Sequence, residues 1–561
     1  MGQRPVPGQA TERPSSEKKS KGTPLSKKLE TNLKTLKDIF HVPESSDVVF
    51  REFTCGRPPV KAFVAYIDNL SASRAVFEMV LQPLMLLSSI RNPNKGDPSE
   101  YLREALIPNG QVSTKKTIEA TVESMVVGDS VVLVDGSDTA LAVETKGWEH
   151  RTVGEAVSER VVRGPQHGFV EILRTNTALV RSILQTPNLV VENLDVGVRA
   201  RTKCALLYLK GIVNPKIVQE VRRRVTSIDT AEVLSSGTLG QFIETRHSLF
   251  PTIMSTERPD RVAHFIMQGM CAVIVSGDPF ALVMPATVLT FIHSPEDRYI
   301  RWPYGNLLRA IRYLALFLTV FFPGLYVAVV NYHPEMIPTT LITVIAGSRQ
   351  NIPFPLSVEL LLIYVGFELI REAGIRIPSA IGPTIGIVGA LLIGEAAVSA
   401  SIISPILVIV IAVTGVASFT LPNVEMAMFT RIATLIFILA GSVFGLLGIV
   451  SVTYILLSQT LSLSSFGVPY FAPLAPTQSS THGLMVPEVS RDEKRPAYLK
   501  TLDDTRQGSP SRGWDFGKTL EPEKIRDSKG GKGLGKQNSS KTAFKGKQQE
   551  PEQPGSDKGS R

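Results

Sequence analysis

Cysteine and recognisable catalytic motifs are both scarce in this sequence. Its 561 residues include three cysteines, Cys55, Cys204 and Cys271, which are far apart and lack the CxxC or Cys/His spacing of a metal site. Neither a disulfide framework nor a zinc site is therefore indicated. The chain has no Walker loop, no GxGxxG after a strand, no HExxH and no nucleophile elbow. We therefore expect no cofactor, no metal and no enzymatic activity.

Long apolar runs are missing from the first half of the chain. The first one begins near Leu307, and Met1 to Lys37 lacks the apolar stretch of a cleavable signal. We therefore expect everything before Leu307 to stay in the cytosol.

The two ends of the chain are poor in large apolar groups and rich in charge. The net charge is +9; residues 1–38 carry 9 Lys and Arg against 4 Asp and Glu, and residues 485–561 carry 17 against 12. Such tails bury too little surface to offset the entropy of ordering, so we expect 1–45 to be disordered, and 461–561 mostly so. Basic tails can bind nucleic acid or an anionic leaflet. We favour solvated flanks on the cytoplasmic side and expect no nucleic-acid partner.

Residues 46–304 alternate short apolar strands with helix-like stretches, which is typical of an α/β fold. The region also matches itself at a shift of about 141 residues: Gly128-Asp-Ser-Val-Val-Leu-Val-Asp-Gly136 matches Gly269-Met-Cys-Ala-Val-Ile-Val-Ser-Gly277. Each copy is predicted to be a hairpin with glycine in its turn. In the second copy, Asn214 and Pro215 predict the cap and first residue of a helix. We infer two similar α/β subdomains, 46–150 and 151–304.

Residues 305–460 are predicted to form an all-α transmembrane domain, because a spanning helix needs about 20 mostly apolar residues. The expected segments are 307–330, 356–370, 381–403, 405–421 and 432–457. Arg298, Arg301, Arg309 and Arg312 at the N-terminal edge of the first segment favour a cytoplasmic start, and Pro323-Gly324 predicts a kink late in it. Five crossings would leave the basic tail outside. We expect a cytoplasmic tail, so 337–349 joins a sixth crossing or one segment is re-entrant.

Five charged residues inside this domain are candidates for an ion path or for contacts between helices. Glu395 lies near the middle of its segment, where a carboxylate costs about 3 kcal/mol to insert. It therefore serves an ion path or a partner contact, or it bonds to Ser or Thr of a neighbouring helix. Glu368, Arg371 and Glu372 have the spacing of pairs on one helix face. Glu359 lies in a first helical turn, where the helix dipole favours an anion.

Small residues recur every four positions along the 381–403 segment. They are Gly382, Gly386, Ala390 and Gly394. Such a stripe lets another helix pack at close range, and it predicts tight contacts within a bundle or between subunits.

Several motifs, taken in order, resemble the GerA family, the A subunits of bacterial spore germinant receptors. They are Arg163-Gly164-Pro165, Glu257-Arg258-Pro259-Asp260, Ser294-Pro295-Glu296-Asp297, Pro353-Phe-Pro355, Phe367-Glu368-Leu-Ile-Arg371-Glu372, Ile387-Val-Gly-Ala390 and Gly467-Val-Pro-Tyr470. The resemblance runs from about 47 to about 500. The chain departs from the family at Gln268-Gly269-Met270, where Glu-Gly-Arg is usual, and at Glu395, where Gln is frequent. These departures put in doubt any charge contact that the family makes there.

The resemblance implies a multi-pass protein of the spore inner membrane that triggers germination. It also implies partners: a transporter-like B subunit and a lipoprotein C subunit, with a ring of A subunits that passes monovalent cations. One alternative is a family paralogue that serves the dipicolinate-release machinery. A stand-alone secondary transporter would need inverted repeats within 305–460, which we do not find, and a membrane-anchored enzyme would need a catalytic constellation.

Overall fold

The computed structural model describes residues 22–55, 59–68, 70–86, 98–105, 107–108, 111–147, 154–246, 248–376, 394–477 and 483–507. Our predictions for residues 1–21 and 508–561, and for Gly382, Gly386 and Ala390, fall outside these ranges.

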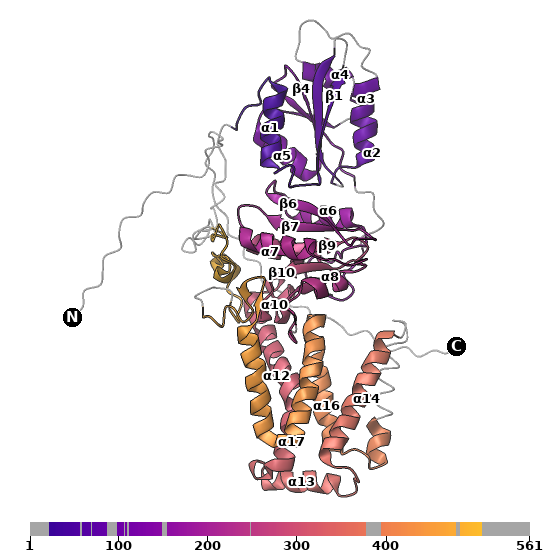
Figure 1. The fold of residues 1–561 in the computed structure, drawn as a ribbon, viewed down its shortest axis with the longest axis vertical. Helices are drawn as coiled ribbons and strands as arrows, with labels where there is room; N and C mark the ends of the chain where they lie inside the picture. Colours follow the sequence, from indigo (N-terminus) through magenta and orange to yellow (C-terminus); the bar gives the residue numbers. More distant parts are fainter. Residues whose placement is uncertain are drawn as a thin grey trace, which may run out of the picture. The chain divides into compact units, whose positions relative to one another are not determined.

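The first subdomain is a five-stranded antiparallel sheet with helices on both faces (Figure 1). Its strands are β1 (Val48–Cys55), β2 (Val60–Ile67), β3 (Val112–Lys115), β4 (Ser130–Val134) and β5 (Ala140–Val143), in the order β1-β2-β4-β5-β3. Its helices are α1 (Leu29–Ile39), α2 (Ser73–Val76), the π-helical turn η1 (Phe77–Leu81), α3 (Gln82–Leu86), α4 (Pro98–Ala105) and α5 (Ile118–Val127).

Alternate residues of the central strands feed two separate cores. Phe63 and Ala65 of β2 pack with α1 and α5 on one face, and Ala62 and Val64 pack with the α2–α4 side on the other. Side chains alternate across a strand, so a strand that is apolar at every position must be covered on both faces.

Helix α1 corrects the expectation that residues 1–45 are disordered. Leu29, Leu36 and Phe40 are buried in the first core, and Asp135 accepts a hydrogen bond from the Leu29 amide at 3.1 Å. The apolar residues recur every three or four positions among the lysines, which is the pattern of an amphipathic helix. The high lysine content of this stretch concealed that periodicity.

The second subdomain repeats the first. Its strands are β6 (Leu189–Val196), β7 (Thr202–Leu209), β8 (Met254–Thr256), β9 (Cys271–Val275) and β10 (Ala281–Met284), in the order β6-β7-β9-β10-β8. Its helices are α6 (Leu173–Ile183), α7 (Pro215–Thr226), α8 (Ser236–Ile243), α9 (Pro259–Gln268), α10 (Val288–Ile292) and α11 (Glu296–Tyr299). The two strand orders are equivalent, so the repeat inferred from the sequence is confirmed.

Local predictions in the repeat also hold. The hairpins β4–β5 and β9–β10 turn at Gly136 and Gly277, whose φ angles are 91° and 90°. A glycine adopts these left-handed angles without the steric cost that other residues meet. Helix α7 starts as expected, because the Asn214 side chain accepts a hydrogen bond from the Lys216 amide at 3.1 Å.

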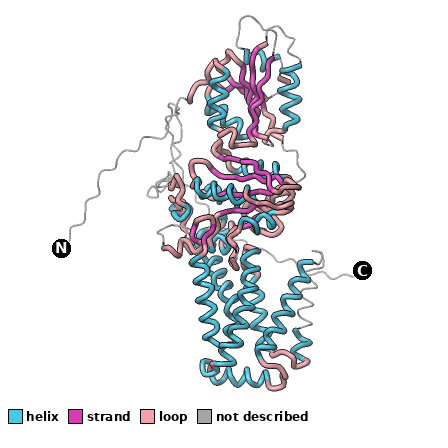
Figure 2. Tube along the Cα trace, in the orientation of Figure 1, coloured by secondary structure: helices cyan, strands magenta, loops and turns pink. Residues whose placement is uncertain are grey.

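The C-terminal part of the described chain is helical (Figures 1 and 2). Its elements are α12 (Trp302–Tyr332), the 3-10 turn η2 (Pro334–Met336), α13 (Thr339–Arg349), α14 (Leu356–Arg376), α16 (Pro405–Ser418) and α17 (Val424–Ser462). Among the described residues, α12 and α17 are long and apolar enough to cross a membrane. Helix α13 spans only about 16 Å, too short to cross unaided, and it runs crosswise to the long helices in Figure 1.

Helix α17 is two helices joined at Gly445, which corrects the single segment expected at 432–457. Gly445 has φ 61° and ψ −143°, outside the helical region. Beyond Gly445 the chain folds back on itself. This is seen at Gly448, where a Cβ would meet the carbonyl oxygen of Ala440, whereas in a straight helix these two residues would be about two turns apart. Both ends of α17 consequently return to the second subdomain, where Met426 and Leu463 contact one core.

The chain after α17 also folds onto the second subdomain. A two-stranded hairpin forms from β11 (Ser464–Ser465) and β12 (Val468–Pro469), and short turns follow at η3 (Val489–Arg491) and η4 (Ala497–Leu499). Tyr470 and Leu499 are buried in the subdomain core. Residues 461–477 and 483–507 belong to the region that we expected to be mostly disordered, yet they are largely packed. Their few apolar groups fill a site on the second subdomain.

Candidate functional site in the helical domain

Glu359 is fully buried and connects three helices. The Arg349 guanidinium, at the end of α13, donates to Glu359 Oε1 with N–O distances of 3.1 and 3.2 Å. The backbone amide of Ser404, which caps α16, donates to Oε2 at 3.1 Å. Both carboxylate oxygens are therefore satisfied within one chain. Of the two roles considered for Glu359, this geometry corresponds to a helix contact.

A second charged cluster lies among α12, α14, α16 and α17. Glu368 pairs with Arg371 at 3.0 Å, as the spacing predicted, and Arg431 of α17 lies 3.9 Å from the other carboxylate oxygen. Arg371 also donates to the Ser418 hydroxyl at 2.7 Å, and its guanidinium lies 4.7 Å from the centre of the Phe367 ring. The cluster is shared by three helices, so it reports how those helices pack.

This second cluster surrounds a small polar cavity. The cavity has a volume of about 10 Å³, enough for a single water, and Thr319, Thr414 and Thr434 also line it. The Nε atoms of Arg371 and Arg431 are buried and have no hydrogen-bond partner among the described residues. Unsatisfied guanidinium nitrogens in an apolar bundle are costly, and a water in the cavity could satisfy them.

Glu372 and Glu395 do not join either cluster. Both side chains are exposed, Glu372 on α14 and Glu395 on a short helical stretch at 394–399. Gly394, the one described member of the small-residue stripe, has no described atom within 4 Å of where a Cβ would lie. Gly394 and Glu395 therefore lie together on an open part of the helix surface.

Helices α12 and α17 approach each other closely. A Cβ on Gly324 would lie 2.6 Å from the backbone oxygen of Phe437, and one on Gly441 would lie 2.5 Å from the backbone oxygen of Gly324. Pro323 lies inside α12 and cannot donate to the Thr319 carbonyl. The Thr434 hydroxyl of α17 donates to that carbonyl instead, at 2.8 Å. The proline defect is thus repaired by the neighbouring helix.

Tyr332, at the end of α12, supports the break in α17. Its hydroxyl donates to the carbonyls of Ser442 and Val443 at 2.8 and 3.0 Å. The break at Gly445 deprives these carbonyls of their helical donors. The Tyr332 ring would also lie 3.0 Å from a Cβ on Gly445, so only glycine fits there.

Asp297 fastens α12 to the second subdomain. Its side chain is fully buried and accepts hydrogen bonds from Arg309 Nε at 2.9 Å and from the two terminal nitrogens of Arg312 at 2.8 and 2.6 Å. Nearby, His293 of the subdomain contacts the Tyr313 hydroxyl at 2.8 Å. We had assigned Arg309 and Arg312 to the cytoplasmic charge excess; the structure places them in this buried pair.

Comparison with known proteins assigns a family to this arrangement. The family model described as Bacillus/Clostridium GerA spore germination protein matches residues 34–498, which covers both subdomains and all the described helices of the bundle. The chain belongs to the GerA family. The resemblance inferred from the motifs is thereby confirmed.

Individual GerA relatives match over most of their length. The chain is 39% identical over 475 residues to spore germination protein KA of Bacillus subtilis, covering 84% of this chain and 87% of that protein. It is 35% identical over 454 residues to the uncharacterized membrane protein YfkQ of the same organism, covering 81% and 87%. The crystal structure of the N-terminal domain of the A subunit of the Bacillus megaterium germinant receptor GerK3 is 33% identical, with a TM-score of 0.38, covering 47% of this chain and 97% of that one.

Proposed function

We propose that this GerA-family chain is the A subunit of a spore germinant receptor and lies in the membrane with its two subdomains on the cytoplasmic side. The family supports the role in germination. The helices support the membrane: the most apolar windows of α12 and α17 are only 39% and 33% buried. Their exposed residues include Leu314, Phe317, Leu447 and Val450. Apolar faces of this length are stable in lipid and not in water.

The contacts support an even number of crossings. Helix α12 starts at the second subdomain, and α17 both starts and ends there. Helices α14 and α16 run parallel, since Glu359 contacts the start of α16 at Ser404 and Arg371 contacts its end at Ser418. The chain between α14 and α16 must then return across the membrane. We therefore propose six crossings, with the sixth supplied by the fold-back of α17 instead of by 337–349.

The exposed carboxylates point to where ions would pass. Glu359 and Glu368 are held by arginines of the same chain, whereas Glu395 is exposed at the helix surface. We propose that copies of this chain associate along the face that carries Gly394 and Glu395, and that a monovalent cation path runs between them. Transporter-like and lipoprotein subunits complete the receptor and supply the trigger.

Purification from spores in mild detergent tests the assembly. A receptor subunit runs as a multimer together with transporter-like and lipoprotein partners, and spores without it stop responding to at least one nutrient. A monomer without partners, in spores that germinate normally on every nutrient, would overturn the proposal.

Ion conduction by the assembled complex tests the path. Glu395→Ala should either reduce the cation current or alter its ion selectivity. Glu359→Ala serves as the comparison, because its loss should lower stability and leave selectivity intact. Equal currents for wild type and Glu395→Ala would remove Glu395 from the path.

A further inference from the structure

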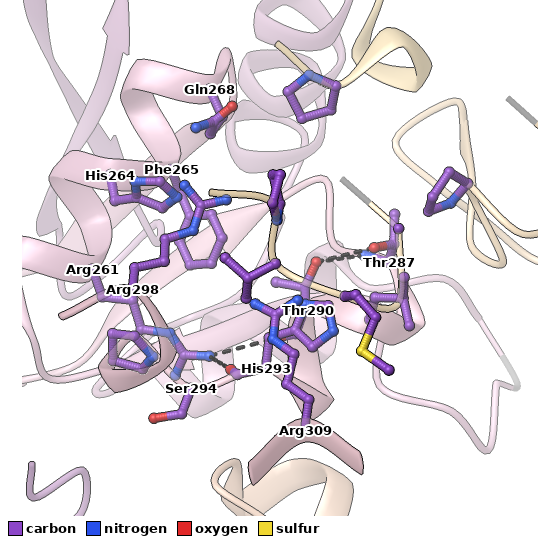
Figure 3. A pocket seen from close by; sticks show the side chains of 18 of the residues that line it. Arg261, His264, Phe265, Gln268, Thr287, Thr290, His293, Ser294, Arg298 and Arg309 are labelled. Atoms are coloured by element: carbon purple, nitrogen blue, oxygen red, sulfur yellow. Dashed lines mark hydrogen bonds between the residues drawn. The ribbon is translucent and has the colours of Figure 1, made fainter. Parts of the chain in front are cut away.

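A cavity lies where the second subdomain meets the root of α12 and the C-terminal segment (Figure 3). Its volume is about 120 Å³, the space of roughly four liquid waters. Residues of α9, α10, α12 and the 483–498 stretch all contribute to the wall. The cavity is thus large enough for a small polyatomic ion.

The wall of this cavity is positively charged. It includes Arg261, Arg298 and Arg309, and among the described residues that line it there is no carboxylate. The acids that pair with these arginines lie behind them: Glu159 is 3.0 Å from Arg261, and Asp297 is 2.9 Å from Arg309.

Two of the acids behind the wall each serve two arginines. Asp297 is shared by Arg309 and Arg312. Asp492 lies 3.6 Å from Arg298 and also pairs with Arg506. The pairs that the structure shows therefore leave more guanidinium groups than carboxylates around the cavity, and in a low-dielectric site this excess attracts an anion.

Neighbouring titratable groups respond to the same charge. Burial, followed by the charge of Arg506, lowers the pKa of Arg298 to about 10. Burial also holds the pKa of His293 well below its usual value, and Arg309, Arg312, Arg298 and Arg261 lower it further. Each cation therefore raises the free energy of the others.

The side-chain amide of Gln268 is an independent indication that the cavity binds a ligand. Its side chain lines the cavity and is 3% exposed, yet neither its Nε2 nor its Oε1 has a hydrogen-bond partner among the described residues. A buried amide without partners costs free energy, and native structures satisfy such groups with protein, water or a ligand. The Nε2 group is one donor more for an anion that the arginines already favour.

We propose that this cavity, whose wall includes Arg298, Arg309 and the Gln268 amide, binds a small oxyanion of the phosphate or carboxylate class. Charge-assisted hydrogen bonds from arginine fit such oxygens in pairs. The bound ion would join the second subdomain, α12 and the C-terminal segment. It would therefore stabilise one packing of the helices against the subdomain, whatever partners the chain has.

Calorimetric titration of the full-length chain in a neutral detergent tests the site. Inorganic phosphate and malonate are titrated separately at constant ionic strength set with chloride. A third arm compares nanodiscs of phosphatidylcholine with and without phosphatidic acid, which distinguishes a free ion from a lipid headgroup. Saturable binding in any arm supports the proposal if it depends on Gln268, whereas heats equal to those of chloride in all arms overturn it.

Two substitutions of Gln268 and one control substitution test whether anion binding depends on this residue. Gln268→Glu places a carboxylate in the wall and should weaken binding about tenfold or more, and Gln268→Met should weaken it less because the charge is unchanged. Arg222→Gln breaks the Arg222–Glu192 pair elsewhere in the subdomain and should leave the affinity unchanged. Unaltered affinity in Gln268→Met and Gln268→Glu would overturn the site, and either folded variant is sufficient to decide.

Discussion

Asp297 is the side chain on which the junction between the subdomains and the helices depends most directly. It is fully buried and neutralises two guanidinium groups of α12. Asp297→Asn leaves both arginines buried without their counter-ion and should destabilise the chain by about 3–5 kcal/mol. Thermal unfolding in detergent measures this loss. Asp503→Asn is the control: Asp503 is half exposed beside Arg495, so its loss should destabilise the chain much less than Asp297→Asn does. Equal losses would contradict the assignment.

His293 should make the same junction sensitive to acid. Its pKa in the folded chain is depressed by burial and by arginines of α9, α11 and α12, while in the unfolded chain it is near 6.5. The unfolded state therefore binds more protons below pH 6.5, so stability should fall as the pH drops through and below that value. Midpoints of thermal unfolding between pH 5 and 8 would show this slope.

The His293→Gln variant should lose part of that slope. His41, whose pKa burial also lowers, keeps the remainder. An unchanged pH profile in His293→Gln would contradict a neutral buried imidazole.

At this scale the sequence predicted contacts between near neighbours and missed distant ones. The Glu368–Arg371 pair follows from i, i+3 spacing on one helix. Asp297 pairs with arginines 12 and 15 positions ahead, across the turn between α11 and α12. Nothing in the spacing indicates that turn, so the arginines were assigned to the membrane edge.

At the scale of the secondary-structure element, the packing of α12 against α17 depends on glycine. A Cβ on Gly324 would lie 2.6 Å from the backbone of α17, which cannot yield as a flexible side chain would. Gly324→Ala should destabilise the bundle by about 1–3 kcal/mol, as overpacking does. Unfolding in detergent is the measurement.

Gly347 of α13 provides the matched control for Gly324. No atom lies within 4 Å of its virtual Cβ. Gly347→Ala should be neutral or stabilising by up to about 1 kcal/mol through helix propensity. A Gly324→Ala variant as stable as Gly347→Ala would contradict the close approach.

Hydropathy was sufficient to locate the helices of the bundle, but it did not show where one apolar run is broken into two helices. Residues 432–457 form one apolar run without a charged residue, so the reversal at Gly445 was missed. The signal was present as Gly441, Gly445 and Gly448, but a φ of 61° does not alter hydropathy. In the subdomains, by contrast, glycine between two short apolar strands predicted both hairpins correctly.

The proposed topology of the whole molecule can be tested by labelling introduced cysteines with a thiol reagent. Burial raises the pKa of Cys55 and raises those of Cys204 and Cys271 to about 12, so the native thiols should react slowly. A membrane-impermeant maleimide should label Gly347→Cys in intact cells. It should label Gly483→Cys only after permeabilisation. Labelling of both from outside would rule out an even number of crossings.

At the scale of the whole molecule, the duplicated domain could be predicted from the sequence, whereas the packing of the C-terminal segment could not. Repeated motifs imply repeated folds, and the strand orders agree. A polar stretch with a few apolar residues reads as disordered until the site that receives Tyr470 and Leu499 is known. That site lies on an element formed more than two hundred residues earlier.

The return of the chain to the second subdomain sets an order for biogenesis. Phe466, Tyr470 and Leu499 belong to the core of that subdomain, yet the ribosome makes them after every helix of the bundle. In the proposed topology, the core of the second subdomain would therefore stay incomplete until the helices have inserted. It could be completed only after the last helix has returned to the side on which the first one started.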